Sequence, residues 1–161
     1  MILILEIVSM DNFDISLLIP VFNCELYVER AIRSALQNKN LSPNLEIVVI
    51  DDCSSDQTPE ILKKFEKKVK IITHKKNLGL PSALNTGILE SSGQFIVRLD
   101  ADDLLTTKFL ESYSDLIKNE EYDFLYSDYF VIDADGNIVG EMCLPEFSKK
   151  EIFSRGDFLA T

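Results

Sequence analysis

The sequence predicts an α/β fold of three layers, α/β/α, in which helices cover both faces of a mainly parallel sheet and a β-hairpin follows. Short apolar runs alternate four times with segments whose apolar residues recur at helical spacing. Such alternation favours right-handed crossovers between parallel strands. Further along the chain, apolar segments flank Asp135 and Gly136, a pair of residues typical of hairpin turns.

The first two strands and helices follow from clear local signals. Residues 15–20 form an apolar run that ends at a proline, as expected of a buried parallel strand. An amphipathic helix is predicted to begin near Glu25. Residues 45–50 form the second strand, and Thr58 is expected to cap the next helix with Pro59 at its first position.

The third and fourth repeats are shorter. Residues 69–73 predict the third strand, and the helix after it is expected from about residue 81 to residue 90, closed by Gly93 as a C-terminal cap. Residues 95–99 predict the fourth strand. A further helix over residues 109–117 would be capped by Thr106 or Thr107.

The domain organisation is expected to be simple. A chain of 161 residues with 46% hydrophobic residues can bury one good core. Residues 1–14 are interpreted as an N-terminal extension, of which residues 1–9 add nothing to the fold; an extra edge strand is the alternative. The first eight residues lack a basic leader and are too short to span a bilayer. The hairpin strands are predicted at residues 124–133 and 137–142.

Composition excludes several classes of protein. The formal net charge of −11, from 27 acidic and 16 basic residues, disfavours a nucleic-acid partner. An acidic protein that binds an anionic ligand needs a cation or helix N-termini at the site. Three cysteines without a C-x-x-C pair argue against a disulfide framework and a structural zinc site, and favour a cytoplasmic setting.

Polar residues gather at the ends of the predicted strands. Ligands of open parallel sheets bind outside the carboxyl ends of the strands. Asp100, Asp102 and Asp103 follow the fourth strand. Three carboxylates so close together repel each other unless a cation lies among them, and such oxygen ligands suit Mg²⁺ or Mn²⁺. A solvated turn with an acidic helix cap is the alternative.

The other strand ends carry weaker signals. Asp51 and Asp52 could form a strand-ending turn, but their place beside the fourth strand favours contact with a base or ribose. Asn77 and Gly79 have an equally plain interpretation as turn residues. His74 is interpreted as a solvated loop residue without a role.

In their order along the chain, these motifs resemble family 2 glycosyltransferases, the inverting group with the GT-A, Rossmann-like fold. The matching stretches are SLLIPVFNCELYVERAIRSAL, VVIDDCSSDQT, NLGLPSALNTGI and VRLDADD, which span about Ile15 to Asp103. Asn85 and Gly87 match helix positions of the family. The resemblance implies a sugar-nucleotide-binding domain over residues 15–161, truncated before the acceptor-binding half, with a UDP-sugar as the favoured donor.

The resemblance also implies roles for single residues. Nucleotide binding would fall to Pro20, Val21, Asn23, Glu25, Asp52, Asn77, Gly79, Asp100 and Asp102. Within this set, Asp52 would bind the base and Asp100 would face the ribose and diphosphate. Asp102 would hold Mn²⁺ or Mg²⁺ with help from Asp103.

Such enzymes transfer a sugar to an acceptor hydroxyl with inversion, here a saccharide or lipid-linked acceptor in polysaccharide or glycolipid synthesis. The metal stabilises charge on the leaving diphosphate, and a general base deprotonates the acceptor. Relatives carry that base on the acceptor half, so it is expected beyond Thr161. The alternative is a non-catalytic module or inactive fragment that only binds a sugar nucleotide. A cytoplasmic location is expected, and peripheral association with the inner face of the membrane is left open.

Overall fold

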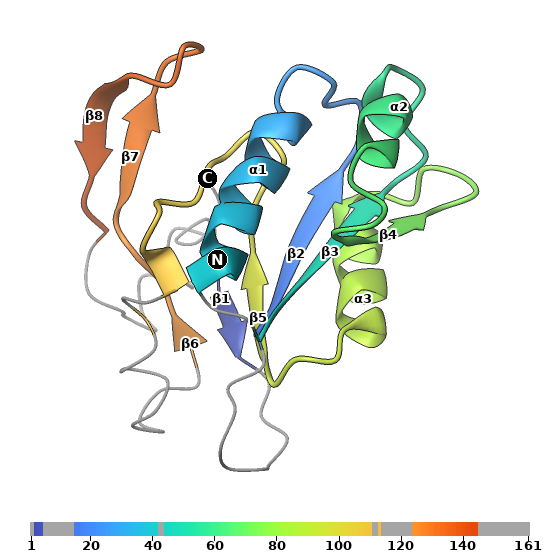
Figure 1. The fold of residues 1–161 in the computed structure, drawn as a ribbon, viewed down its shortest axis with the longest axis horizontal. Helices are drawn as coiled ribbons and strands as arrows, with labels where there is room; N and C mark the ends of the chain where they lie inside the picture. Colours follow the sequence, from blue (N-terminus) through green and yellow to red (C-terminus); the bar gives the residue numbers. More distant parts are fainter. Residues whose placement is uncertain (1, 5–14, 42–43, 111–112, 114–123, 145–161) are drawn as a thin grey trace, which may run out of the picture. The chain divides into compact units, whose positions relative to one another are not determined.

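The fold is known from a computed structural model that describes residues 2–4, 15–41, 44–110, 113 and 124–144 (Figure 1). These residues divide into two compact units, one within residues 2–124 and one from residue 125 onward. Each unit is described by itself.

The larger unit is an α/β sheet structure. Its elements are β1 (Ile2–Ile4), β2 (Ile15–Val21), α1 (Val28–Leu41), β3 (Leu45–Asp51), α2 (Thr58–Lys63), β4 (Lys70–Thr73), α3 (Leu80–Glu90) and β5 (Phe95–Arg98). With β6 (Phe124–Leu125), the strands have the order β4-β3-β2-β5-β1-β6. Strands β4, β3, β2 and β5 are parallel to one another, whereas β1 is antiparallel to β5. The predicted fold class is therefore confirmed.

Both faces of the central strands are covered. Leu18, Val48 and Ile50 form one cluster with Ala83 of α3. Residues that alternate with these along β2 and β3 point to the other face, where α1 contacts both strands, and they are fully buried as well. Burial on both faces explains why these strands are continuous apolar runs rather than alternating ones.

Two predicted helix caps are wrong. The side chain of Thr58 does not cap α2: its Oγ1 accepts a hydrogen bond from the Cys24 N–H at 2.9 Å, and the Asp56 carboxylate instead accepts from the Thr58 N–H at 2.9 Å. Gly93 does not close α3, because the residue after the helix is Ser91, in an extended conformation. At the start of α2 and at the end of α3, several neighbouring residues could serve as the cap. Local sequence preference does not show which of them takes that role.

The N-terminal residues and the helix predicted at residues 109–117 had different outcomes. Ile2–Ile4 form a strand, which is the alternative interpretation of residues 1–9, although β6 lies beyond it in the sheet. Phe109, Leu110 and Tyr113 are helical. The rest of the helix predicted at residues 109–117 lies outside the described residues. Among the helices that the structure describes, none is long and apolar enough to cross a lipid bilayer.

The smaller unit contains the predicted hairpin. Strands β7 (Tyr129–Ile132) and β8 (Ile138–Met142) pair antiparallel. The Asp133 carboxylate accepts backbone hydrogen bonds from Asp135 and Asn137, and Gly136 has a φ of 90°. The first hairpin strand is shorter than predicted, because Phe124–Leu125 belong to β6 of the larger sheet.

Candidate functional site

The register of the sheet brings the predicted loops to one edge. Val21 pairs with Asp51, and Asp51 pairs with Thr73, so β2, β3 and β4 end at the same level. The Leu99 N–H donates to the Leu18 carbonyl at 2.9 Å, which continues the β5 pairing beyond the assigned strand. The segments that follow Val21, Asp51, Thr73 and Leu99 therefore leave the sheet side by side, as predicted.

The loop after β2 is fastened to the loop after β3. The Asn23 carboxamide oxygen accepts from the Ser55 N–H at 2.8 Å, and the Asn23 N–H donates to the Ser54 hydroxyl at 3.0 Å. The Glu25 carboxylate accepts from the Gln57 N–H at 2.7 Å. Asn23 and Glu25, both predicted to line the nucleotide pocket, thus fix the position of the loop after β2 relative to the loop after β3.

Pro20 and Val21 are the last two residues of β2. Both side chains are buried in the sheet. The Val21 carbonyl accepts from the Asp52 N–H at 2.9 Å, so it sets where the loop after β3 begins.

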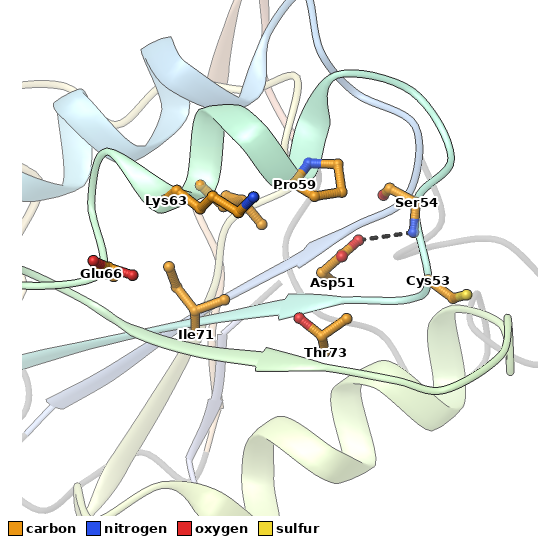
Figure 2. A pocket seen from close by; sticks show the side chains of 9 residues that line it. Asp51, Cys53, Ser54, Pro59, Lys63, Glu66, Ile71 and Thr73 are labelled. Carbon is orange, nitrogen blue, oxygen red and sulfur yellow. Dashed lines mark hydrogen bonds between the residues drawn. The ribbon is translucent and has the colours of Figure 1, made fainter.

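Asp51 and Asp52 point to opposite faces of the sheet. Asp51 lines a pocket of about 420 Å³ between α2 and the ends of β3 and β4, and its carboxylate accepts from the Ser54 N–H at 3.0 Å (Figure 2). The predicted nucleotide-binding residues do not line this pocket. Asp52 faces the loop after β4 and α3. The pair therefore does not act on one ligand as a unit.

The Asp52 carboxylate organises the loop after β4. It accepts from the Leu78 N–H at 2.9 and 3.1 Å, from the Gly79 N–H at 2.7 Å and from His74 Nδ1 at 2.7 Å. Burial acts to raise the pKa of Asp52, but the hydrogen bonds from His74, Leu78 and Gly79 hold it below its usual value. Asp52 is therefore an ionised acceptor inside a ring of donors.

The interpretation of His74 as a solvated residue is wrong. Its side chain is only 9% exposed, and its two ring nitrogens contact Asp52 and Thr86. The prediction was based on the neighbouring Lys75 and Lys76, and both lysines are indeed exposed. The ring turns inward because Asp52 lies at the end of the neighbouring strand, a relation that the sequence order hides.

Gly79 is required by the backbone conformation of its loop, whereas no such requirement is seen at Asn77. Gly79 has a φ of 85°, which only glycine adopts readily, and it immediately precedes α3. That conformation lets its N–H reach Asp52. Asn77 is exposed at the tip of the same loop.

Asp100 forms an ion pair with Arg98, the last residue of β5. Arg98 Nε and Nη2 donate to the two Asp100 oxygens, each at 2.7 Å. An arginine two positions before Asp100 was visible in the sequence, but the prediction of a cation among three aspartates did not take it into account. Two carboxylates, those of Asp102 and Asp103, are left for a metal ion.

Asp102 and Asp103 are exposed beside the loop after β2. Partial desolvation and then the carboxylates of Asp102 and Asp100 raise the pKa of Asp103. Burial and then the carboxylates of Asp102 and Asp56 raise the pKa of the Cys24 thiol, which places Asp102 close to that loop. Negative charge is therefore concentrated where the two loops meet.

Two buried polar residues of α1 hold the segment that follows these aspartates. Ser34 Oγ accepts from the Leu105 N–H at 3.1 Å, and the Asn38 amide donates to the Thr106 carbonyl at 3.0 Å. The sequence did contain a signal for Ser34 and Asn38. Both are polar residues that lie three or four positions from apolar ones, on the inner face of the helix.

The donor set fits a metal that is shared with a ligand. Within the described part of the chain, no three His, Cys, Asp or Glu side chains are placed to hold a metal ion together. Mg²⁺ is commonly bound through one or two carboxylates, with phosphate oxygens and water completing its octahedron. Asp102 and Asp103 match that pattern.

Acid should loosen these loops. Burial acts to raise the pKa of both Asp52 and Asp56, but hydrogen bonds, from Thr58 and Glu25 in the case of Asp56, lower each below the ordinary value of 3.8. A lowered pKa in the folded state means that the stabilisation is present above that ordinary value and is lost as pH falls through the folded-state pKa. We expect the free energy of urea-induced unfolding to fall steeply only below about pH 4.

Asp56→Asn is the variant for this acid titration. It should be less stable than the wild type at neutral pH and should lose less stability on acidification. An acid slope equal to that of the wild type would show that Asp56 is not among the groups that titrate.

Comparisons with known proteins agree with this geometry. A family model described as "Glycosyl transferase family 2" matches residues 16–156. The chain is 32% identical over 138 residues to an Escherichia coli protein named UDP-Glc:alpha-D-GlcNAc-diphosphoundecaprenol beta-1,3-glucosyltransferase WfgD, covering 85% of this chain and 53% of that protein. It is 27% identical over 125 residues to the putative teichuronic acid biosynthesis glycosyltransferase TuaG of Bacillus subtilis, covering 76% and 49%.

Among solved structures, S. aureus TarS in complex with UDP-GlcNAc superposes with a TM-score of 0.60 and 29% identity. The match covers 66% of this chain and 31% of that one. The chain spans about half the length of the two curated relatives named above.

Proposed function

Because the chain belongs to glycosyltransferase family 2, we propose that it binds a UDP-sugar through a divalent metal ion, as the donor side of an inverting glycosyltransferase. The observation that carries the proposal is the meeting of four strand-end loops, with Asp52 buried on one side and Asp102 and Asp103 exposed on the other. A nucleoside diphosphate has matching ends: a base with N–H groups and a charged diphosphate.

In this proposal Asp102 and Asp103 hold Mn²⁺ or Mg²⁺. The ion would supply positive charge at the diphosphate as it leaves, in a region where the protein itself is acidic. Asp100, paired with Arg98, would face the ribose and diphosphate side. Gly79 leaves the pocket edge free of a side chain, with Asn77 beside it.

The acceptor side is proposed from the named relatives. One is named as a glucosyltransferase that uses UDP-Glc and a diphosphoundecaprenol-linked sugar, and another as an enzyme of teichuronic acid biosynthesis. We infer a saccharide or lipid-linked acceptor in the synthesis of a polysaccharide or glycolipid. The general base that would deprotonate the acceptor is not assigned to any described residue.

Calorimetric titration of UDP with and without Mn²⁺ tests the donor site. We expect UDP binding to depend on Mn²⁺, and Asp102→Asn to weaken it by at least about tenfold, equivalent to ~1.4 kcal/mol. The matched control is Glu90→Gln at the far end of α3, where Glu90 pairs with Lys70 near the start of β4, away from the strand ends. This control should bind UDP like the wild type.

Other outcomes would contradict parts of the proposal. Equal binding of UDP in EDTA and in Mn²⁺ would remove the metal. Binding of GDP in place of UDP would replace the donor. Transfer assays with a chain extended to the length of its relatives would then separate an enzyme from a module that only binds sugar nucleotides.

A further inference from the structure

A hydrogen-bonded chain of three side chains runs behind the proposed base site. His74 Nδ1 lies 2.7 Å from Asp52 Oδ1, and His74 Nε2 lies 2.9 Å from Thr86 Oγ1 of α3. The His74 and Asp52 side chains are 9% and 5% exposed. None of the sequence motifs assigns a role to His74 or Thr86.

The partners fix which nitrogen carries hydrogen. An ionised carboxylate only accepts hydrogen bonds, so His74 Nδ1 must donate to Asp52. In the neutral ring, Nε2 then accepts from the Thr86 hydroxyl, which is free to donate in that direction. The direction of the chain is therefore Thr86 to His74 to Asp52.

Three N–H groups donate to the Asp52 carboxylate, and one of them, that of Leu78, is shared between its two oxygens. A carboxylate has about four lone-pair positions. Oδ1 accepts from His74 and Leu78, and Oδ2 accepts strongly from Gly79 at 2.7 Å and weakly from Leu78 at 3.1 Å. The least occupied position is on Oδ2. It suits an additional N–H donor.

We propose that His74, held by Thr86, is a positioning residue for nucleobase selection: it fixes the Asp52 carboxylate so that one acceptor position on Oδ2 meets the N–H edge of the base. This inference rests on the proposed function, because it assumes a nucleotide at this site. Bases with an N–H at that edge, such as uracil, would be accepted. Cytosine, which presents a lone pair there, would face the carboxylate and be rejected.

A purely structural role for His74 makes a different prediction. If His74 only supported the loop, removing it would weaken every nucleotide equally. If His74 acts through Asp52, removing it should weaken only the ligands whose base donates to the carboxylate. The ratio of two affinities therefore distinguishes the roles, whereas a single affinity does not.

The experiment compares UDP with N3-methyl-UDP, which lacks the base N–H, in the presence of Mn²⁺. Wild-type protein should prefer UDP by about tenfold or more, since a missing partner leaves a buried acceptor unpaired. His74→Leu removes both hydrogen bonds and should reduce this preference to about twofold or less. His74→Asn keeps a nitrogen donor at the place of Nδ1 and should retain most of the preference.

Thr86→Val provides an independent measurement with little change in shape. It removes only the outer hydrogen bond, so the preference for UDP should fall to a value between those of the wild type and His74→Leu. It also keeps the inference testable if His74→Leu does not fold, which circular dichroism would reveal.

Each outcome has one meaning. An unchanged preference in His74→Leu or, where that variant does not fold, in Thr86→Val would overturn the inference, as would a wild-type protein that binds both ligands equally. In both cases the UDP site itself would stand. A wild-type protein that binds neither UDP nor N3-methyl-UDP would overturn the proposed function on which the inference depends.

Discussion

Replacing Asp52 with alanine should lower the free energy of unfolding by about 3–5 kcal/mol, because each buried hydrogen-bonding group that loses its partner costs about 1–3 kcal/mol. The Asp52 side chain is 5% exposed, and its carboxylate accepts from two backbone N–H groups and from His74. Alanine leaves all three donors without this acceptor in a region where water has little access. The change would also release the loop that precedes α3.

Urea-induced unfolding followed by circular dichroism measures this effect. Asp102→Ala is the matched control, because Asp102 is exposed and lies among like charges, so its removal should change stability by no more than about 0.5 kcal/mol. Asp52→Asn keeps the shape and one acceptor oxygen, and should fall between the two. A loss below about 1 kcal/mol in Asp52→Ala would mean that water replaces the carboxylate at this loop.

The strands were predictable because one physical requirement dominates each of them. Burial on both faces demands a continuous apolar run, and the runs at residues 15–20 and 45–50 became β2 and β3 with their ends shifted by one residue. Parallel pairing then carries the strand ends to a common edge. For that reason the meeting of the loops at Asp52, Asp100 and Asp102 followed from sequence order alone.

The hydrogen-bond partners within the site were not predictable in the same way. Asp52 and His74 are 22 positions apart, and His74 and Thr86 are 12 apart. Which polar groups meet depends on strand register and on the side to which each loop turns, and neither is encoded in local propensity. The same reason explains why Thr58 does not cap α2: its hydroxyl has a partner in the loop after β2, and the Asp56 carboxylate accepts from the Thr58 N–H.

The sequence identified Gly87 as a position that matches the family, but it did not indicate what this glycine does. The family resemblance places Gly87 in a matching helix, and nothing in the spacing says why. In the structure, a Cβ at Gly87 would lie 2.8 Å from Ile50 Cδ1 and 3.1 Å from Leu18 Cδ1. Gly87 therefore lets α3 approach the sheet closely, and its role is packing rather than contact with a ligand.

Gly87→Leu should destabilise the larger unit by about 3 kcal/mol or more, the upper range for overpacking a close-packed core. Ile50 and Leu18 are both fully buried, so neither can turn aside into solvent, and α3 must move away from the sheet.

Two variants in the same helix calibrate the measurement by urea-induced unfolding. Gly87→Ala gains about 1 kcal/mol of helix propensity and loses a comparable amount to the short contact, so its net change should be small. Leu89→Ala, at a side chain that is 84% exposed, should change stability by less than about 0.5 kcal/mol. If Gly87→Leu unfolded at the same urea concentration as Leu89→Ala, the close approach of α3 to β2 and β3 would not be a requirement of the fold.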